Sequence, residues 1–179
     1  MARVKDFNRI PGLMKEFAKA NRRQVEVGIF EDAPFLVTIG VKNEFGTRIT
    51  VNDALAKKLR AMARENGHPT DNLPKPGEQL IIPERSFMRS AFDEKAAEIS
   101  YEMGALMAKV AAGELEESYE ALYESGRILQ RIIVDAVASG DFAPNDPLTI
   151  AIKGHSRPLI GKTGVLETTQ GIRVRVVWV

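Results

Sequence analysis

The longest regular pattern in the sequence lies in residues 88–140, which read MRSAFDEKAAEISYEMGALMAKVAAGELEESYEALYESGRILQRIIVDAVASG. This pattern is the strongest indication of the fold. Apolar or small residues recur there every three or four positions, which is the spacing that places them along one side of an α-helix. They are Met88, Phe92, Ala96, Ile99, Met103, Leu106 and Val110, and then Leu115, Tyr119, Leu122, Gly126, Leu129, Ile133 and Ala136. The pattern predicts two long amphipathic helices that meet near Gly113 and end at Gly140. They form either an antiparallel hairpin or one kinked helix.

Shorter elements are predicted on both sides of these helices. Helical spacing is found over residues 10–22, with a proline in the first turn, and over residues 53–66, where Asn52 or Asp53 provides the cap. Residues 24–30 (QVEVGIF) and 172–179 (IRVRVVWV) alternate in polarity, as half-buried strands do. Residues 35–45 suit a strand or a helix equally, and the proline-rich residues 67–79 predict a loop.

The order of these elements predicts the fold class. Two strands at opposite ends of the sequence, separated by helices, indicate an α+β fold in which a small antiparallel sheet packs against long amphipathic helices. A length of 179 residues suits one domain. We therefore expect a single domain over residues 1–179, with a helix-plus-loop insertion at about 51–80.

Composition excludes several classes of protein. With 44% hydrophobic residues, 27% charged residues and a net charge of +1, the chain has an ordinary globular composition and no overall field that attracts nucleic acid or a membrane. The absence of cysteine excludes disulfides and thiolate sites. No apolar run of roughly 18 residues and no signal peptide is found, so we expect a cytoplasmic protein.

Charge is nevertheless segregated along the chain. Residues 1–23 carry seven lysines and arginines against two acids, whereas residues 93–124 carry nine acids against two lysines, and residues 150–179 carry five bases against one acid. Such runs either face solvent or form an acidic and a basic surface that meet partners. The basic residues Arg22, Arg23, Lys153, Arg157, Lys162, Arg173 and Arg175 make a small DNA- or RNA-binding accessory protein the alternative function, although few aromatics accompany them.

No catalytic, cofactor or metal site is predicted. The two histidines, His68 and His155, lie in separate loops, and no G-x-S-x-G nucleophile motif is present. Gly161-Lys162-Thr163 matches the end of a phosphate-binding loop, but Ser156 stands where the first glycine is required and no helix is predicted to follow. We therefore expect a protein that is not an enzyme.

Four further strings carry a resemblance to a known family. They are Asn43-Glu44-Phe45-Gly46-Thr47, residues 82–89 (IPERSFMR), residues 149–154 (TIAIKG), and Pro158-Leu159-Ile160 followed by Thr163-Gly164-x-Leu166. In this order, after an early strand, they resemble the neck and tail-completion proteins of long-tailed bacteriophages and prophages, which include virion morphogenesis and minor tail proteins. The chain departs from the family pattern at Ser86, where a second proline is common, and at Gly161-Lys162 inside the last turn.

The resemblance implies a structural subunit rather than an enzyme. Such a subunit forms a homo-oligomeric ring, expected to be hexamer-like, that joins the head connector to the tail and leaves a channel for DNA. The implied partners are further copies of the chain, head-connector and tail-tube proteins, and DNA that passes without sequence recognition; no membrane is involved. The implied location is the host bacterial cytoplasm during assembly and then the neck or tail of the virion.

The motif residues have physical roles of their own. We expect Phe45 in the core beside a turn at Gly46, and Pro83 ahead of the long helix with Glu84 at its positive end and Phe87 packed inward. A tight turn at Thr163-Gly164 is expected to deliver Leu166 to the core. These residues either hold the fold or contact a partner. The full set is Asn43, Glu44, Phe45, Gly46, Thr47, Pro83, Arg85, Phe87, Pro158, Leu159, Thr163, Gly164 and Leu166.

Overall fold

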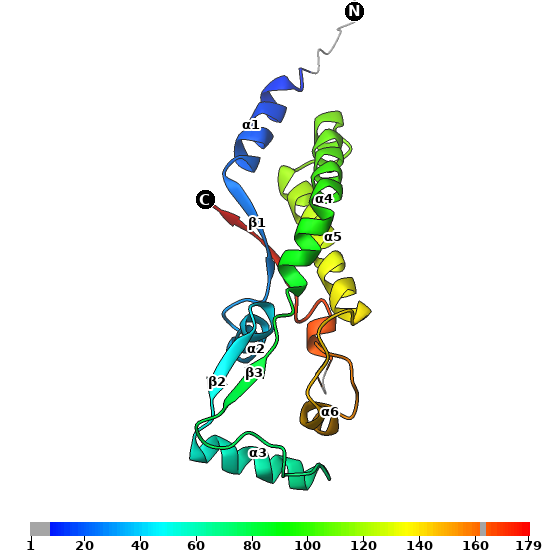
Figure 1. Cartoon of the computed structure of the whole chain (residues 1–179). Coiled ribbons are helices and arrows are strands. Elements are labelled where there is room, and N and C mark those ends of the chain that lie inside the picture. Colours follow the sequence, from blue (N-terminus) through cyan, green and yellow to red (C-terminus); the bar gives the residue numbers. More distant parts are fainter. Residues whose placement is uncertain (1–7, 162–163) are drawn as a thin grey trace, which may run out of the picture.

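The computed structural model describes residues 8–161 and 164–179 and has an α+β fold. Its elements lie along one long axis, with α1 near one end and α3 at the other (Figure 1). The helices are α1 (Ile10–Ala20), α2 (Pro34–Glu44), α3 (Asp53–Glu65), α4 (Phe87–Ala112), α5 (Ser118–Ser139), α6 (Pro147–Lys153) and the 3₁₀ turn η1 (Val165–Glu167). The strands are β1 (Arg23–Gly28), β2 (Thr47–Thr50), β3 (Gln79–Ile82) and β4 (Arg173–Trp178).

The two long helices form an antiparallel hairpin, so the kinked-helix alternative is excluded. α4 and α5 lie side by side over most of their length (Figure 1). Gly113 ends α4 with a φ of 80°, a left-handed conformation that glycine adopts without steric cost. The five residues between the helices are therefore enough to reverse the chain.

The terminal strands pair as the sequence predicts. β1 and β4 are antiparallel, with Val25 opposite Val176 and Gly28 opposite Arg173. One face of this sheet lies against α5 at Gly126, where an added Cβ would come within 2.7 Å of the Val25 and Val174 side chains. The missing side chain therefore lets the helix approach the sheet closely.

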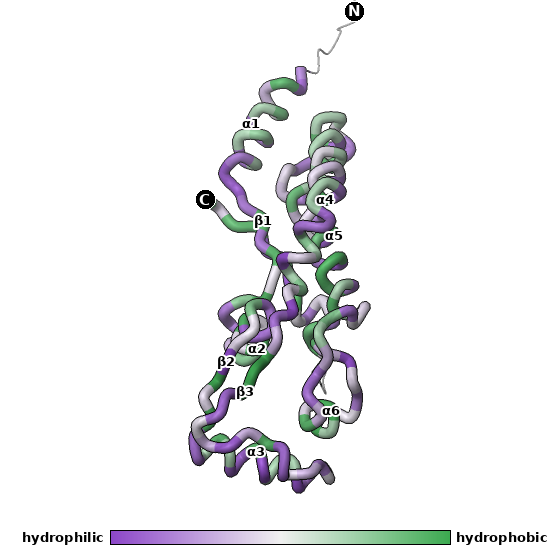
Figure 2. Tube along the Cα trace, viewed as in Figure 1, coloured by the Kyte–Doolittle hydropathy of each residue, from purple (hydrophilic) through white to green (hydrophobic). Residues whose placement is uncertain are grey.

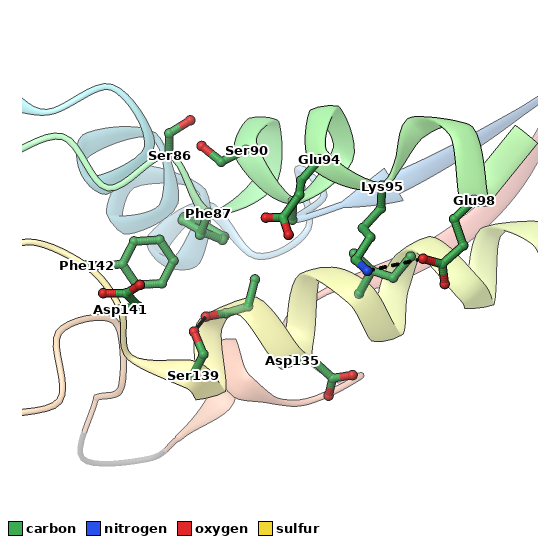
Figure 3. Close-up of a pocket in the computed structure, with 13 residues that line it drawn as sticks. Ser86, Phe87, Ser90, Glu94, Lys95, Glu98, Asp135, Ser139, Asp141 and Phe142 are labelled. Atoms are coloured by element: carbon green, nitrogen blue, oxygen red, sulfur yellow. Dashed lines mark hydrogen bonds and ion pairs between the residues drawn. The ribbon is translucent and has the colours of Figure 1, made fainter.

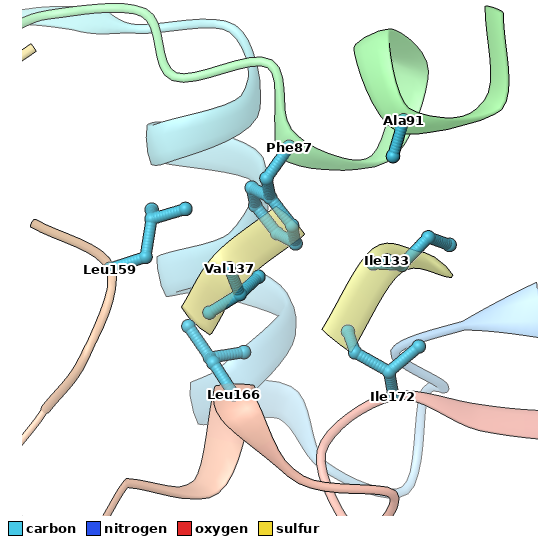
Figure 4. Packing of buried hydrophobic residues seen from close by; sticks show 7 residues of the cluster. All are labelled: Phe87, Ala91, Ile133, Val137, Leu159, Leu166 and Ile172. Carbon is cyan, nitrogen blue, oxygen red and sulfur yellow. The ribbon is translucent and has the colours of Figure 1, made fainter. Parts of the chain in front are cut away.

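The hydrophobic core lies where α4 and α5 meet Leu159, Leu166 and the residue that precedes β4, Ile172 (Figure 4). Phe87 is completely buried, as expected, and so is Ile172 just before β4. The whole buried cluster consists of Phe87, Ala91, Ile133, Val137, Leu159, Leu166 and Ile172.

A second two-stranded sheet lies at the two ends of the segment that contains α3. β2 and β3 are antiparallel, with Thr47 opposite Ile82, and residues 51–78 between them include α3. Asn52 caps α3 by accepting a hydrogen bond from the Leu55 amide at 2.9 Å. The loop at 67–78 is tied down by Leu73, which is buried with residues of α3 and α6. Residues 35–45, ambiguous from sequence, belong mainly to α2.

α1 is held against the start of α5 by Glu16. Its carboxylate accepts hydrogen bonds from the Ser118 amide and hydroxyl, each at 3.2 Å. A hydrogen bond from Lys19 and then the one from the Ser118 amide hold the pKa of Glu16 below its ordinary value. Among the helices of the described residues, none has the length and apolar character needed to cross a membrane.

Candidate functional site: a buried polar junction of the motifs

The resembling strings meet in space although they are far apart in sequence. Polar side chains of the first two strings, together with Asn145, form a cluster at the N-terminal end of α4 that we call the motif junction. It consists of Asn43, Glu44, Arg85, Arg89 and Asn145. Glu44 and Arg85 are each only 5% exposed, whereas Arg89 lies at the surface, so the junction reaches from the interior to solvent.

Glu44 caps α4 from a distant part of the chain. As the last residue of α2, it accepts hydrogen bonds from the Met88 and Arg89 amides at 3.0 Å and from the Arg89 Nε at 3.1 Å. The residue at the usual capping position, Ser86, makes no cap of its own and instead donates to Glu44 at 3.4 Å. A carboxylate at this position satisfies free amides and suits the positive end of the helix dipole.

Arg85 joins three segments through uncharged acceptors. Its Nε donates to the Ala143 carbonyl at 2.7 Å, its Nη1 to the Asn43 Oδ1 at 2.7 Å, and its Nη2 to the Pro144 carbonyl at 2.9 Å. Its own amide donates to the Asn43 carbonyl at 2.6 Å. Burial lowers the pKa of Arg85, which pairs with no carboxylate of the described residues.

Asn145 extends the junction to the segment between the last two strings. It accepts from Arg85 Nη2 at 3.3 Å and donates to the Arg157 carbonyl at 3.0 Å. Lys153 donates from the same side to the Arg157 and Pro158 carbonyls at 2.6 and 2.9 Å. Burial, and secondarily the charge of Arg85, lower the pKa of Lys153.

Two expectations at this site are wrong. The sequence pattern places Phe45 in the core, but the residue is 59% exposed. The reason is that α2 continues through Glu44 and places the Glu44 side chain, not Phe45, toward the interior. The Arg89 guanidinium lies over the Phe45 ring, 4.6 Å from its centroid. Glu84 does not serve the helix end, since α4 begins only at Phe87; it is exposed and pairs with Arg89 at 2.6 Å.

The remaining motif residues lie at turns and in the core. Gly46 has a φ of 65°, and an added Cβ would lie 2.9 Å from the Glu84 amide nitrogen, so the glycine lets the two strings touch. Leu166 is buried as expected, and Gly164 makes the turn before it with a φ of 61°. Leu159 is buried as well. Thr47 begins β2, whereas Pro83 and Pro158 line a groove beside the junction. Thr163 and Lys162 lie outside the described residues.

A cavity of about 500 Å³ lies between the start of α4 and the end of α5 (Figure 3). Glu94, Glu98, Asp135 and Asp141 make its lining acidic, and Lys95 pairs with Glu98 at 3.2 Å. The described residues contain no group of three or more histidine, aspartate or glutamate side chains close enough to hold a metal ion. The cavity is therefore an acidic part of the surface. The motif junction links α2, α4 and the 143–158 segment.

The sequence patterns do not predict the long-range contacts of Glu44 and Arg85. The capping role of Glu44 and the burial of Arg85 depend on partners about 40 to 60 positions away, which local periodicity does not reveal. Asn145 was not singled out, and its setting in Pro144-Asn145-Asp146-Pro147 is also typical of an ordinary turn. The one available signal was the order of the strings themselves.

Comparison with known proteins gives no match. No family model matches the chain, and neither a curated protein nor a solved structure does.

Proposed function

We propose that the chain is a non-catalytic structural subunit of a phage or prophage neck or tail-completion ring that joins the head connector to the tail. The proposal starts from the resemblance carried by the ordered strings. It gains support because the first two of these strings contact each other at the motif junction, which links α2 and α4 to the 143–158 segment. Residues used in this way shape a subunit.

The observation that carries the proposal is the amount of accessible surface. The chain exposes 11,804 Å², whereas a compact monomer of 19.8 kDa is expected to expose about 8,600 Å². Full exposure of all nine undescribed residues would account for only about 1,400 Å² of the difference. An elongated chain with this much surface has room to bury part of it against neighbouring copies, as each subunit of a ring does.

Open sheet edges point in the same direction. Both sheets have two strands, and a two-stranded sheet is marginally stable unless its edges and faces are covered. Beside one of them, Trp178 is 64% exposed and the Arg23 guanidinium stacks between the Trp178 and Tyr119 rings, at 4.5 and 5.4 Å. Exposed tryptophan, tyrosine and arginine are enriched at the centres of protein interfaces.

The alternative, a nucleic-acid-binding accessory protein, is less well supported. Arg173 pairs with Asp32, and Arg175 pairs with Glu26 at 2.5 Å and with Glu31 at 3.0 Å. The basic terminal strand thus has much of its charge compensated within the chain. Binding to phosphates would require these arginines to exchange their carboxylate partners.

Deletion of the gene from the phage or prophage that carries it tests the proposal. We expect electron micrographs of the induced lysate to show filled heads and separate tails, and a plasmid copy of the gene to restore joined particles. Normal particles from the deleted phage would contradict the proposal. Loss of DNA replication or transcription with particle joining intact would favour the nucleic-acid alternative instead.

A further inference from the structure

A groove of about 340 Å³ lies beside the motif junction, between β3 and the 145–161 segment. Its walls are apolar, and in Figure 2 the β3 portion is among the most hydrophobic parts of the trace. Two cations, Arg85 and Lys153, also line the groove. The apolar lining residues include Ile39, Leu80, Ile82, Pro83, Leu159 and Ile160.

Within residues 8–161 and 164–179, each of these cations retains a donor without an acceptor. Arg85 has five N–H groups and makes four side-chain hydrogen bonds, all to neutral oxygens, which leaves one N–H of Nη1. Lys153 has three N–H groups and makes two hydrogen bonds, both to carbonyls. The groove therefore offers two donors from two adjacent positive charges.

Within the described residues, neither of these cations is paired with a carboxylate. No carboxylate lies within 4 Å of either cation, and the acid on the groove lining, Asp146, caps α6 through the Leu148 amide at 2.9 Å. Cations removed from water are costly unless a paired anion and hydrogen bonds compensate them. A carboxylate entering the groove would provide both.

The edge of β3 gives an extended segment a place to lie. The Val51 amide donates to the Glu78 carbonyl at 2.8 Å. In an antiparallel ladder, every second residue of a strand bonds to its partner strand, so the backbone groups of Gln79 and Ile81 point away from β2. Ile81 is also 60% exposed. Backbone donors beside an apolar groove are the features that strand addition uses.

We propose that this groove binds the acidic loop of residues 113–117 from a second copy of the chain. This inference rests on the proposed function, because it names the contact between neighbouring ring subunits. The loop carries Glu114, Glu116 and Glu117, all exposed, so its charge complements the two cations. The basic strand β4 is less suited to this role, since its arginines are already paired.

The groove and the acidic loop of one chain are too far apart to meet, so the contact must join two copies. The groove adjoins the N-terminal end of α4, whereas the acidic loop follows its C-terminal end, and 26 helical residues separate them by about 39 Å. The loop therefore cannot reach the groove of its own chain. A contact between two different surfaces of neighbouring copies is the type that closes a ring.

Peptide binding to the full chain gives the first test. A fluorescent peptide of residues 112–119 should bind, and replacing its three loop glutamates by glutamine should weaken binding by about tenfold or more. Lys153→Met should weaken it to a similar extent, whereas Lys57→Met, at an exposed position on α3, should leave the affinity unchanged. Equal binding of the glutamate and glutamine peptides would overturn the inference.

Charge reversal in the assembly gives the second test. With connector and tail-tube proteins present, Lys153→Glu alone and Glu116→Lys alone should each reduce ring formation, and the two changes in one chain should restore it. Rings that form equally with all variants would overturn the inference and leave the proposed function standing. If the peptide binds in a glutamate-dependent way but no ring forms, the groove's preference for an acidic ligand stands and the proposed function is rejected. Binding of an acidic peptide from another neck protein, but not of residues 112–119, would also overturn the second-copy assignment.

Discussion

Replacing Glu44 with alanine tests the motif junction most sharply, and we expect it to lower the free energy of unfolding by about 3 kcal/mol. Loss of a helix cap costs about 0.5 to 2 kcal/mol. Here the lost cap is the acceptor of two amides, those of Met88 and Arg89, and each buried group left unsatisfied costs about 1 to 3 kcal/mol, which places the expected loss above that of a single exposed cap. For a chain of this length, 3 kcal/mol corresponds to a decrease in melting temperature of about 6 to 12 °C.

Denaturant unfolding monitored by circular dichroism measures this effect. Glu44→Gln keeps one acceptor oxygen and should lose about half as much stability. The matched control is Glu84→Ala, which removes another carboxylate partner of Arg89; because that pair is exposed, the change should stay within about 0.5 kcal/mol. If Glu44→Ala and Glu84→Ala were equally mild, Glu44 would not cap α4 as described.

Three other changes have clear expected outcomes. Gly46→Ala should destabilise the chain by at least about 2 kcal/mol more than Gly67→Ala in denaturant unfolding. Both glycines have a φ of 65°, but only Gly46 lacks space for a Cβ. Equal losses of stability would show that residues 43–47 and 82–89 do not touch there. Gly126→Ala should lower stability by about 1 to 3 kcal/mol, whereas Gly104→Ala, on an open face of α4, should raise it by about 0.5 to 1 kcal/mol. A gain in stability from Gly126→Ala as large as that from Gly104→Ala would refute the close packing of α5 on the sheet. Hydrogen bonds from a lysine and an amide hold the pKa of Glu16 below 4.5, so its contribution to stability is present above that pH and is lost as the pH falls through the lower folded value. The melting-temperature difference between the wild type and Glu16→Gln should therefore stay constant from pH 7 to pH 5 and shrink at lower pH; a constant difference down to pH 3 would contradict this.

The long elements could be predicted from sequence because their patterns repeat many times. The helical spacing through 88–136 predicts α4 and α5, and glycine at 113 and 140 predicts their ends. Alternating polarity likewise predicts the two terminal strands and their location in one sheet. These features follow from local chemistry and from the need to bury one face of each element.

The short strands and the junction could not be predicted in the same way. β2 and β3 have four residues each, which is too few for a period to stand out. Phe45 was expected in the core because it is aromatic, yet the helical phase of α2 buries Glu44 instead. Glu84 is adjacent to α4 in sequence, whereas Glu44 reaches the helix end only through the fold. Such pairings depend on tertiary contacts that a linear pattern does not contain.

The central claim is that copies of this chain close into a ring between head connector and tail. Negative-stain electron microscopy with particle mass measurement, on the purified chain mixed with its cognate connector and tail-tube proteins, tests it most directly. We predict closed rings of uniform diameter, with a mass equal to a small whole number of copies, seated on the connector. A chain that stays monomeric beside both partners while binding DNA with a steep salt dependence would contradict the claim.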